Sequence, residues 1–313
     1  MKQTTFASIA WNAKGKVTRR ERFLSEMERV IPWARLCALI EPHYPKGARG
    51  RPLMPLERML RIYFMQQWFN LSDPAAEDAL YDSESIRRFA GVELADDAVP
   101  DETTILKFRH LLERHRLTAA IFAEVRALLE QRGLLLKSGT IVDATIISAP
   151  SSTKNATDRR DPEMHQVRKG KNWHFGMKLH VGADRHGLVH SLTGTAANVA
   201  DITQIDCLLH GAERAVYGDQ AYWSQDHRAH CAQAGIAYRV NRRGHAARPL
   251  TEQQKRINRA RSRVRARGEH AFRVVKQLWG FAKTRYRGLA KNTARAFSAF
   301  ALANLYLMRH RLA

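Results

Sequence analysis

Three acidic residues, far apart in the sequence, occur in settings where carboxylates can do chemistry. Asp143 interrupts an apolar, strand-like run, and Asp219 follows a second short run of the same kind. Glu269 lies in a long arginine-rich segment with helical periodicity. Carboxylate oxygens are the ligands that Mg²⁺ prefers, and a pair of such ions serves in-line phosphoryl displacement. We therefore predict that Asp143, Asp219 and Glu269 are catalytic and bind metal.

Each acid also has a simpler interpretation. A buried, unpaired carboxylate is costly, but backbone donors alone could satisfy Asp143. Asp219 could cap the helix that follows it, and Glu269 could form an i, i+4 ion pair with Arg265. The combination of two strands and a late helix is what favours a shared site.

The net charge indicates the class of partner. The 313 residues include 52 Lys and Arg against 30 Asp and Glu, a formal net charge of +22. Self-repulsion of that size weakens a compact state, so we expect a polyanionic partner, and nucleic acid fits best. An anionic membrane surface is the rival, but the chain lacks a basic amphipathic anchor. A glycosidase with paired carboxylates is a remote alternative, because a neutral sugar needs no such charge.

Basic residues gather around the acids in three segments: between the first two expected strands, after the last strand, and along the late helix. If some six of them engage phosphates, log affinity should fall with log salt at a slope of roughly −5. The expected DNA contacts are Arg265, Lys276, Arg261, Arg273, Lys169, Lys171, Arg242 and Arg243.

The chain has no apolar run near the roughly 20 residues needed to span a bilayer, and its first residues lack the pattern of a signal peptide. Cys37, Cys207 and Cys231 follow no CxxC spacing, which argues against a zinc ribbon. These features predict a cytoplasmic protein with reduced cysteines and no membrane association.

The element pattern changes after Gly133. Residues 55–132 show helical periodicity, typical of a helix-turn-helix or of a bundle used in assembly, and both remain open. Beyond Gly133, strands alternate with helices, which predicts an α/β fold: a mixed sheet with flanking helices, preceded by an all-helical N-terminal domain. The element order is also that of the ribonuclease H fold. The expected strands are 134–147, 173–181, 188–195, 215–217 and 236–240, and the expected helices are 201–210, 223–234, 252–278 and 293–309.

The helix expected at 252–278 carries an apolar stripe, predicted to be its buried face. Arg265, Glu269 and Lys276 share a neighbouring face, because offsets of four and seven residues nearly coincide around a helix. Trp223, soon after Asp219, is more typical of core packing than of stacking on a base. The predicted stripe is Ile257, Ala260, Val264, Gly268, Ala271, Val275 and Leu278.

At these residues the chain resembles the DDE transposases of small bacterial insertion sequences, in the insertion-sequence-five family. The resemblance covers nearly all of the chain. One departure is visible, since the broader signature places a Tyr three residues before the Arg and this chain has Ser262 there. The matching segments are Pro100–Thr104, Phe108–Leu112, Val142–Thr145, His174–Lys178, Gly218–Tyr222, and the spacing Arg265, Glu269, Lys276.

The resemblance implies a ribonuclease H-like core whose DDE triad binds two Mg²⁺ or Mn²⁺ ions. It implies a nucleoid-associated enzyme that reads terminal inverted repeats, cuts the ends of its element and joins the 3′ hydroxyl to target DNA. It further implies a homodimer or higher oligomer, with Arg265 and Lys276 near the DNA ends. A catalytically silent descendant, acting as a DNA-binding protein or repressor, is the alternative.

The predicted domains are a helical DNA-binding or assembly domain at 1–133, a ribonuclease H-like catalytic domain at 134–290, and a C-terminal helix at 291–313 that packs on the core.

Overall fold

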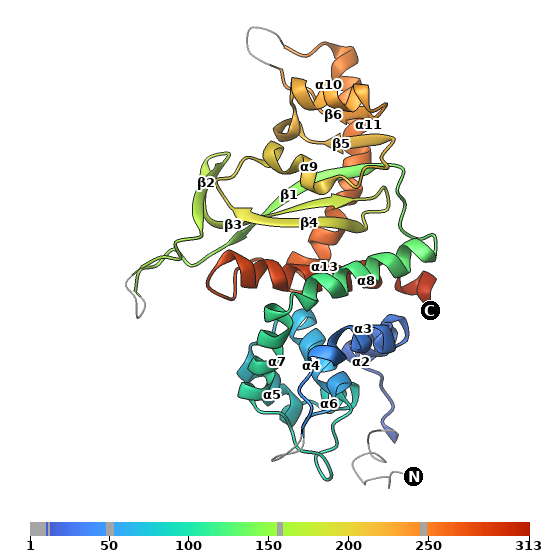
Figure 1. Ribbon diagram of the computed structural model, residues 1–313, viewed down its shortest axis with the longest axis vertical. Helices are drawn as coiled ribbons and strands as arrows, with labels where there is room; N and C mark the ends of the chain where they lie inside the picture. The colour runs from blue at the N-terminus through green and yellow to red at the C-terminus, as the bar shows by residue number, and fades with distance from the viewer. Residues whose placement is uncertain (1–10, 12, 48–52, 155–158, 245–248) are drawn as a thin grey trace.

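The computed structural model describes residues 11, 13–47, 53–154, 159–244 and 249–313. Figure 1 shows a helical part at one end of an elongated molecule and a sheet with its own helices at the other. Helices α8 and α13 lie side by side between the two parts. The predicted order of a helical region followed by a mixed sheet is confirmed.

The helical part begins earlier than the sequence analysis predicted. In the described residues before position 55 there are three helical segments that were not expected. The helix α2 begins with a capping box, in which the Thr18 side chain and Glu21 bond each other's backbone amides. That Thr-x-x-Glu spacing was the available signal. The helices are α2 (Arg19–Val30), α3 (Trp33–Ile40), η1 (Glu41–His43), α4 (Leu56–Trp68), α5 (Asp73–Asp82), α6 (Glu84–Ala90), α7 (Glu102–Arg114) and α8 (Leu117–Gln131).

The sheet is mixed, as predicted, but in the described residues it has six strands instead of five. The additional strand β2 was missed because its side chains are mostly exposed and polar, so it has no apolar alternation. The strands are β1 (Thr140–Ser148), β2 (His165–Lys169), β3 (Asn172–Ala183), β4 (Val189–Ala196), β5 (Ala215–Gly218) and β6 (Ala237–Val240).

Strand β1 is the central strand. It pairs antiparallel with β3 along its whole length, and parallel with β5 only at Thr140 and Ile141. Strands β2 and β4 both pair with β3, while β6 extends the sheet beyond β5. Since β1 and β5 part after Ile141, this edge of β1 has no strand partner from Val142 to Ile147 in the described chain, and at Ser148 it pairs with Lys283. Asp143 lies on this open stretch.

Helical segments cover both faces of the sheet and include η3, a single turn after β5. They are η2 (Asp201–Gln204), α9 (Ile205–Leu208), η3 (Gln220–Tyr222), α10 (Gln225–Gln233), α11 (Glu252–Arg265), η4 (Ala266–Gly268), α12 (Glu269–Phe272), η5 (Arg273–Leu278) and α13 (Leu289–Leu312).

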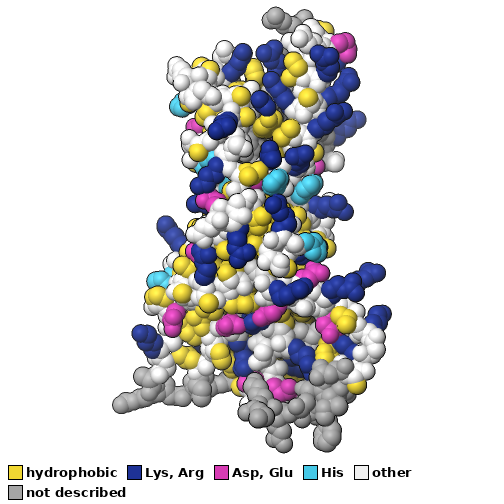
Figure 2. Space-filling model, turned by 90° about the vertical axis from the view of Figure 1, so that its right-hand side faces the viewer, with side chains coloured by type: hydrophobic (Ala, Val, Ile, Leu, Met, Phe, Trp, Pro, Cys, Tyr) yellow, Lys and Arg dark blue, Asp and Glu magenta, His cyan; other side chains and the backbone are white. Residues whose placement is uncertain are grey.

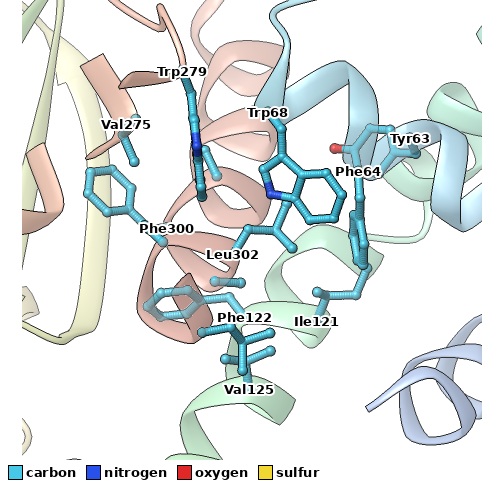
Figure 3. Close-up of a cluster of buried hydrophobic side chains, with 14 of the residues drawn as sticks. Tyr63, Phe64, Trp68, Ile121, Phe122, Val125, Val275, Trp279, Phe300 and Leu302 are labelled. Carbon is cyan, nitrogen blue, oxygen red and sulfur yellow. The ribbon is translucent and has the colours of Figure 1, made fainter. Parts of the chain in front are cut away.

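One hydrophobic core joins the N-terminal helices, α13 and one face of the sheet. Figure 3 shows Trp68 of α4 and Phe122 of α8 gathered with Trp279 and with Phe300 of α13. A smaller cluster of buried residues, which includes Val142 and Tyr222, is separate from this core. The larger core runs across the predicted boundaries at 133/134 and 290/291, and the division into three domains stays a prediction.

The long helix expected at 252–278 is broken in the structure, and the predicted stripe is only partly correct. Gly268, Ala271 and Val275 are buried, whereas Ile257 and Leu278 are 41% and 57% exposed, and Ala260 is exposed too. The residues after α11 form a tight turn, one α-helical turn and then a wider π turn. Each change of winding rotates the following side chains, so a constant period of 3.6 does not describe this segment.

Candidate active site

A cavity of about 590 Å³ opens beside the free edge of β1. All three predicted acids line it, together with a fourth carboxylate that the sequence analysis did not single out. The lining side chains that carry charge are Asp143, Asp201, Asp219, Glu269, Lys169, Arg168, Lys178 and Arg265.

Asp143 lies deepest among the three predicted acids. Burial raises the pKa of its carboxyl to about 6, an effect that the positive charge of Arg265 and the amide of Ala144 oppose. That amide donates to Asp143 Oδ1 at 2.9 Å. The negative charges of Asp219 and Glu269 raise the pKa further. Asp143 is therefore close enough to both other acids for their charges to act on it.

Asp219 has two different roles at its two oxygens. Its Oδ1 accepts from the amide of Ala221 at 2.8 Å, so Asp219 does cap the short turn η3. Its Oδ2 lies 3.7 Å from Nη1 of Arg265. Capping thus leaves the second oxygen directed toward the cavity cations.

Glu269 reaches the cavity because the residue before it has no side chain. A Cβ on Gly268 would lie 2.9 Å from Cγ2 of Ile141, so only glycine lets this helix approach β1 so closely. Ile141 lies two residues before Asp143 on the same strand. The i, i+4 ion pair considered for Glu269 does not form in the described chain, since Arg265 pairs with Asp219 instead.

The fourth carboxylate, Asp201, belongs to a partly buried ion pair. Lys178 Nζ donates to Asp201 Oδ1 and to the carbonyl of Val199, each at 2.8 Å. The two side chains are 11% and 20% exposed. Lys178 fell within a motif used for the resemblance, but no sequence pattern connected it to Asp201, because residues 23 positions apart meet only through the fold.

Tyr222 lies beneath the same carboxylates. Burial raises the pKa of its hydroxyl, and the charges of Asp201, Asp143 and Asp219 add to the effect. Its hydroxyl is buried without a hydrogen-bond partner in the described chain. Tyr222 belongs to the smaller core cluster and also lies close to the acids. It comes only one turn after Asp219, in the segment Gly218–Tyr222.

The eight expected DNA contacts fall into two groups. Lys169 and Arg265 line the cavity. Lys276 is next to it, since its Nζ donates at 2.9 Å to Thr145 Oγ1 and to the carbonyl of Ile146, both lining residues. Burial lowers the pKa of Lys276, and the nearby charge of Lys169 lowers it further.

The remaining expected contacts lie outside the cavity lining. Arg261 Nη1 donates to the carbonyl of Val240 at 2.7 Å, at the end of β6. Figure 2 shows many Lys and Arg side chains at the upper end of the molecule, where Figure 1 places α10, β6 and α11. The others, all exposed, are Arg242, Arg243, Lys171 and Arg273.

Trp223 is half-buried against the smaller core cluster, with its ring 5.9 Å from that of Tyr238. This packing agrees with the favoured interpretation of Trp223 as a core residue. Among the helices that the structure describes, none has the length and apolar character needed to cross a membrane.

The donor set fits a hard divalent cation. The three predicted acids line one cavity together with Asp201, and burial raises the pKa of Asp143, with the negative charges of Asp219 and Glu269 adding to the effect. In the described ranges, no three His, Cys, Asp or Glu residues already form a compact metal-binding group. The acids are thus gathered around the cavity without being closed on a common point.

The strand order β4-β3-β1-β5-β6, with acids on β1, after β5 and on a late helix, defines a ribonuclease H-like fold of the DDE type. Comparison with family models agrees: residues 135–305 match the Transposase DDE domain, and residues 11–111 match the Transposase domain (DUF772). The chain belongs to the Transposase DDE domain family. No solved structure matches it. Members of such families act in DNA transposition, typically with divalent metal ions.

Proposed function

We propose that the protein is a DNA transposase of the insertion-sequence-five family. It binds the terminal inverted repeats of its element, cleaves the DNA ends and joins the 3′ hydroxyl to target DNA. The observation that carries this proposal is the single cavity lined by Asp143, Asp219 and Glu269. The family match and the net charge of +22 support DNA as the substrate.

In this mechanism Asp143, Asp219 and Glu269 would hold two Mg²⁺ ions, with Mn²⁺ as a substitute. When bound, such ions would supply activation of the attacking oxygen and charge neutralisation at the leaving oxygen. Because the pKa of Asp143 is about 6, its carboxyl is mostly ionised at neutral pH and ready to act as a ligand. Arg265 compensates part of the negative charge around Asp219.

The cations at the cavity receive the DNA backbone. Lys276 and Lys169 lie beside one another at its rim, and neither has a carboxylate partner within ion-pair distance in the described chain. A phosphodiester entering here would meet two positive charges while its scissile bond faces the acids. We further propose that a homodimer or higher oligomer assembles on DNA, because two element ends must be processed together.

The decisive experiment uses labelled duplexes taken from the DNA that flanks the coding sequence, incubated with Mg²⁺ or with EDTA. Nicking that requires Mg²⁺ is expected. Asp143→Ala, Asp219→Ala and Glu269→Ala should each abolish nicking and leave DNA binding largely intact. Asp206→Ala is the matched control, since its side chain is 78% exposed and lies outside the cavity.

Near-normal cutting by any one of the three variants would remove that residue from the site. A mobility shift without nicking under all metal conditions would instead identify a catalytically silent DNA-binding protein.

The phosphate contact at Lys276 has its own test. Lys276→Ala should weaken binding to the duplexes and reduce the slope of log affinity against log salt by about 0.9, the value of one lost phosphate contact on B-DNA. An unchanged slope would show that the ammonium serves only Thr145 and Ile146 within the protein.

A further inference from the structure

Among the large hydrophobic side chains in the described residues, Trp173 is the most exposed, at 66%. Its ring makes no ring-stacking or cation–ring contact in the described part of the chain. The other tryptophans of the sheet-bearing half behave differently: Trp279 is 3% exposed and Trp223 packs on Tyr238. Packing within this chain therefore gives no account of the position of Trp173.

The location of Trp173 is next to the catalytic cavity. It lies on the β2–β3 hairpin, at one edge of the sheet in Figure 1, directly across from Arg168 in the strand register. Side chains directly opposite on an antiparallel pair have Cβ atoms about 5 Å apart. Arg168 and its neighbour Lys169 both line the cavity that contains the acids. The indole is thus one side chain away from the cavity wall.

The hairpin carries charge of one sign only. Residues 165–174, HQVRKGKNWH, include Arg168, Lys169 and Lys171 and no acid. Five register pairs hold the two strands together, and Arg168 Nε also donates to the carbonyl of Gly170 in the turn at 3.2 Å. The hairpin therefore presents an aromatic ring among fixed cations on a paired backbone.

From this arrangement we infer that Trp173 stacks on an unpaired base at an end of the DNA whose backbone lies along the hairpin and enters the cavity. Aromatic rings interleaved with cations are the chemistry that holds unpaired nucleotides, since every base has a face to stack and every link carries a phosphate. An intact duplex offers base faces only at its ends. The site therefore takes frayed or cut DNA ends. This inference rests on the proposed function insofar as DNA is the substrate.

The test compares two fluorescent duplexes of the same sequence, one blunt and one with a short single-stranded 3′ overhang, by anisotropy at one fixed salt concentration. The wild-type protein should bind the overhang duplex more tightly. Trp173→Ala should lose roughly 5- to 150-fold in affinity for it, the range for one base–aromatic stack. Its affinity for the blunt duplex should change much less.

Two further variants separate stacking from general damage. Trp173→Phe keeps an aromatic face and should retain most of the preference for the overhang. Leu278→Ala is the control, since it removes another exposed apolar side chain, 57% exposed, that does not line the cavity. A 2-aminopurine placed in the overhang should be quenched by wild-type protein and not by Trp173→Ala.

The outcomes distinguish the inference from the proposed function. If the wild-type protein binds neither duplex, the proposed function fails. If it binds both and Trp173→Ala keeps the full overhang preference and the quenching, the stacking role of Trp173 is refuted while the transposase proposal stands.

Discussion

Replacing Asp143 by Asn should make the metal-free protein more stable. Burial raises the pKa of the Asp143 carboxyl from its ordinary value of 3.8 to about 6, so the ionised form is disfavoured in the folded state. A change of that size in an acid constant corresponds to about 3 kcal/mol, because each tenfold change is worth about 1.4 kcal/mol. Asn has nearly the same shape, retains an oxygen to accept from the Ala144 amide, and carries no charge.

The expected gain for Asp143→Asn is about 1–3 kcal/mol at neutral pH, which for a chain of this size raises the melting temperature by about 2–6 °C. The assay is thermal unfolding in EDTA, followed by calorimetry. Asp206→Asn serves as the matched control, because its side chain is 78% exposed and its charge is already solvated. It should leave the melting temperature nearly unchanged.

The stability difference between Asp143→Asn and the wild type should depend on pH. A carboxyl whose pKa is raised by folding contributes stability that is full below its unfolded pKa near 4 and is lost as the pH rises through about 6. The wild-type protein should therefore approach Asp143→Asn in stability as the pH falls from 7 toward 4. Added Mg²⁺ should stabilise the wild-type protein and not the variant.

A melting temperature for Asp143→Asn at or below that of the wild type in EDTA would refute this reasoning. It would mean that the Asp143 carboxylate is already well compensated without metal, and that its burial carries no cost.

Three further predictions follow from the same site. Mn²⁺ affinity, measured by calorimetric titration, should be nearly constant above pH 7 and fall about tenfold per pH unit below pH 6, because Asp143 must lose its proton to bind the ion. A flat affinity profile down to pH 5 would exclude this carboxyl as a ligand. Lys178→Met should cost about 1–3 kcal/mol in urea unfolding, because among the described residues it leaves the half-buried Asp201 with only His180 within ion-pair distance. Adding Asp201→Asn should recover part of that loss, whereas no recovery would mean that the pair is not coupled. Gly268→Ala should cost about 1–3 kcal/mol because its Cβ meets Ile141, and its effect should not be additive with that of Ile141→Ala.

Local signals were sufficient for much of the fold. Alternating apolar residues identified β3, the turn that follows it identified β4 as the returning strand, and helical periodicity identified α4. The helix expected at 293–309 corresponds to α13 to within a few residues. Both patterns arise because one side of a helix or strand is buried, and the spacing of apolar residues within the element shows this. Where an element buries little, the pattern is absent, and β2 was missed for that reason.

The stripe on the late helix failed for a related reason. A hydrophobic period assumes one winding, and the chain changes its winding three times around Glu269, at Ala266, Glu269 and Arg273. Gly268 was read as one member of an apolar stripe, although its role is to let the helix approach Ile141. Contact between segments so far apart in sequence leaves no local period.

The sequence by itself determined the types of chemistry available: three acids in strand and helix settings, a large positive charge, and motifs whose order points to the DDE class. Only the tertiary structure decided which of these side chains share one cavity, that Asp201 and Lys178 join them, and that Trp173 remains exposed beside them. The reason is that residue type and local burial are encoded along the chain, whereas distances between remote side chains are set by how β1 and β5 diverge and how closely η4, which carries Gly268, packs on β1.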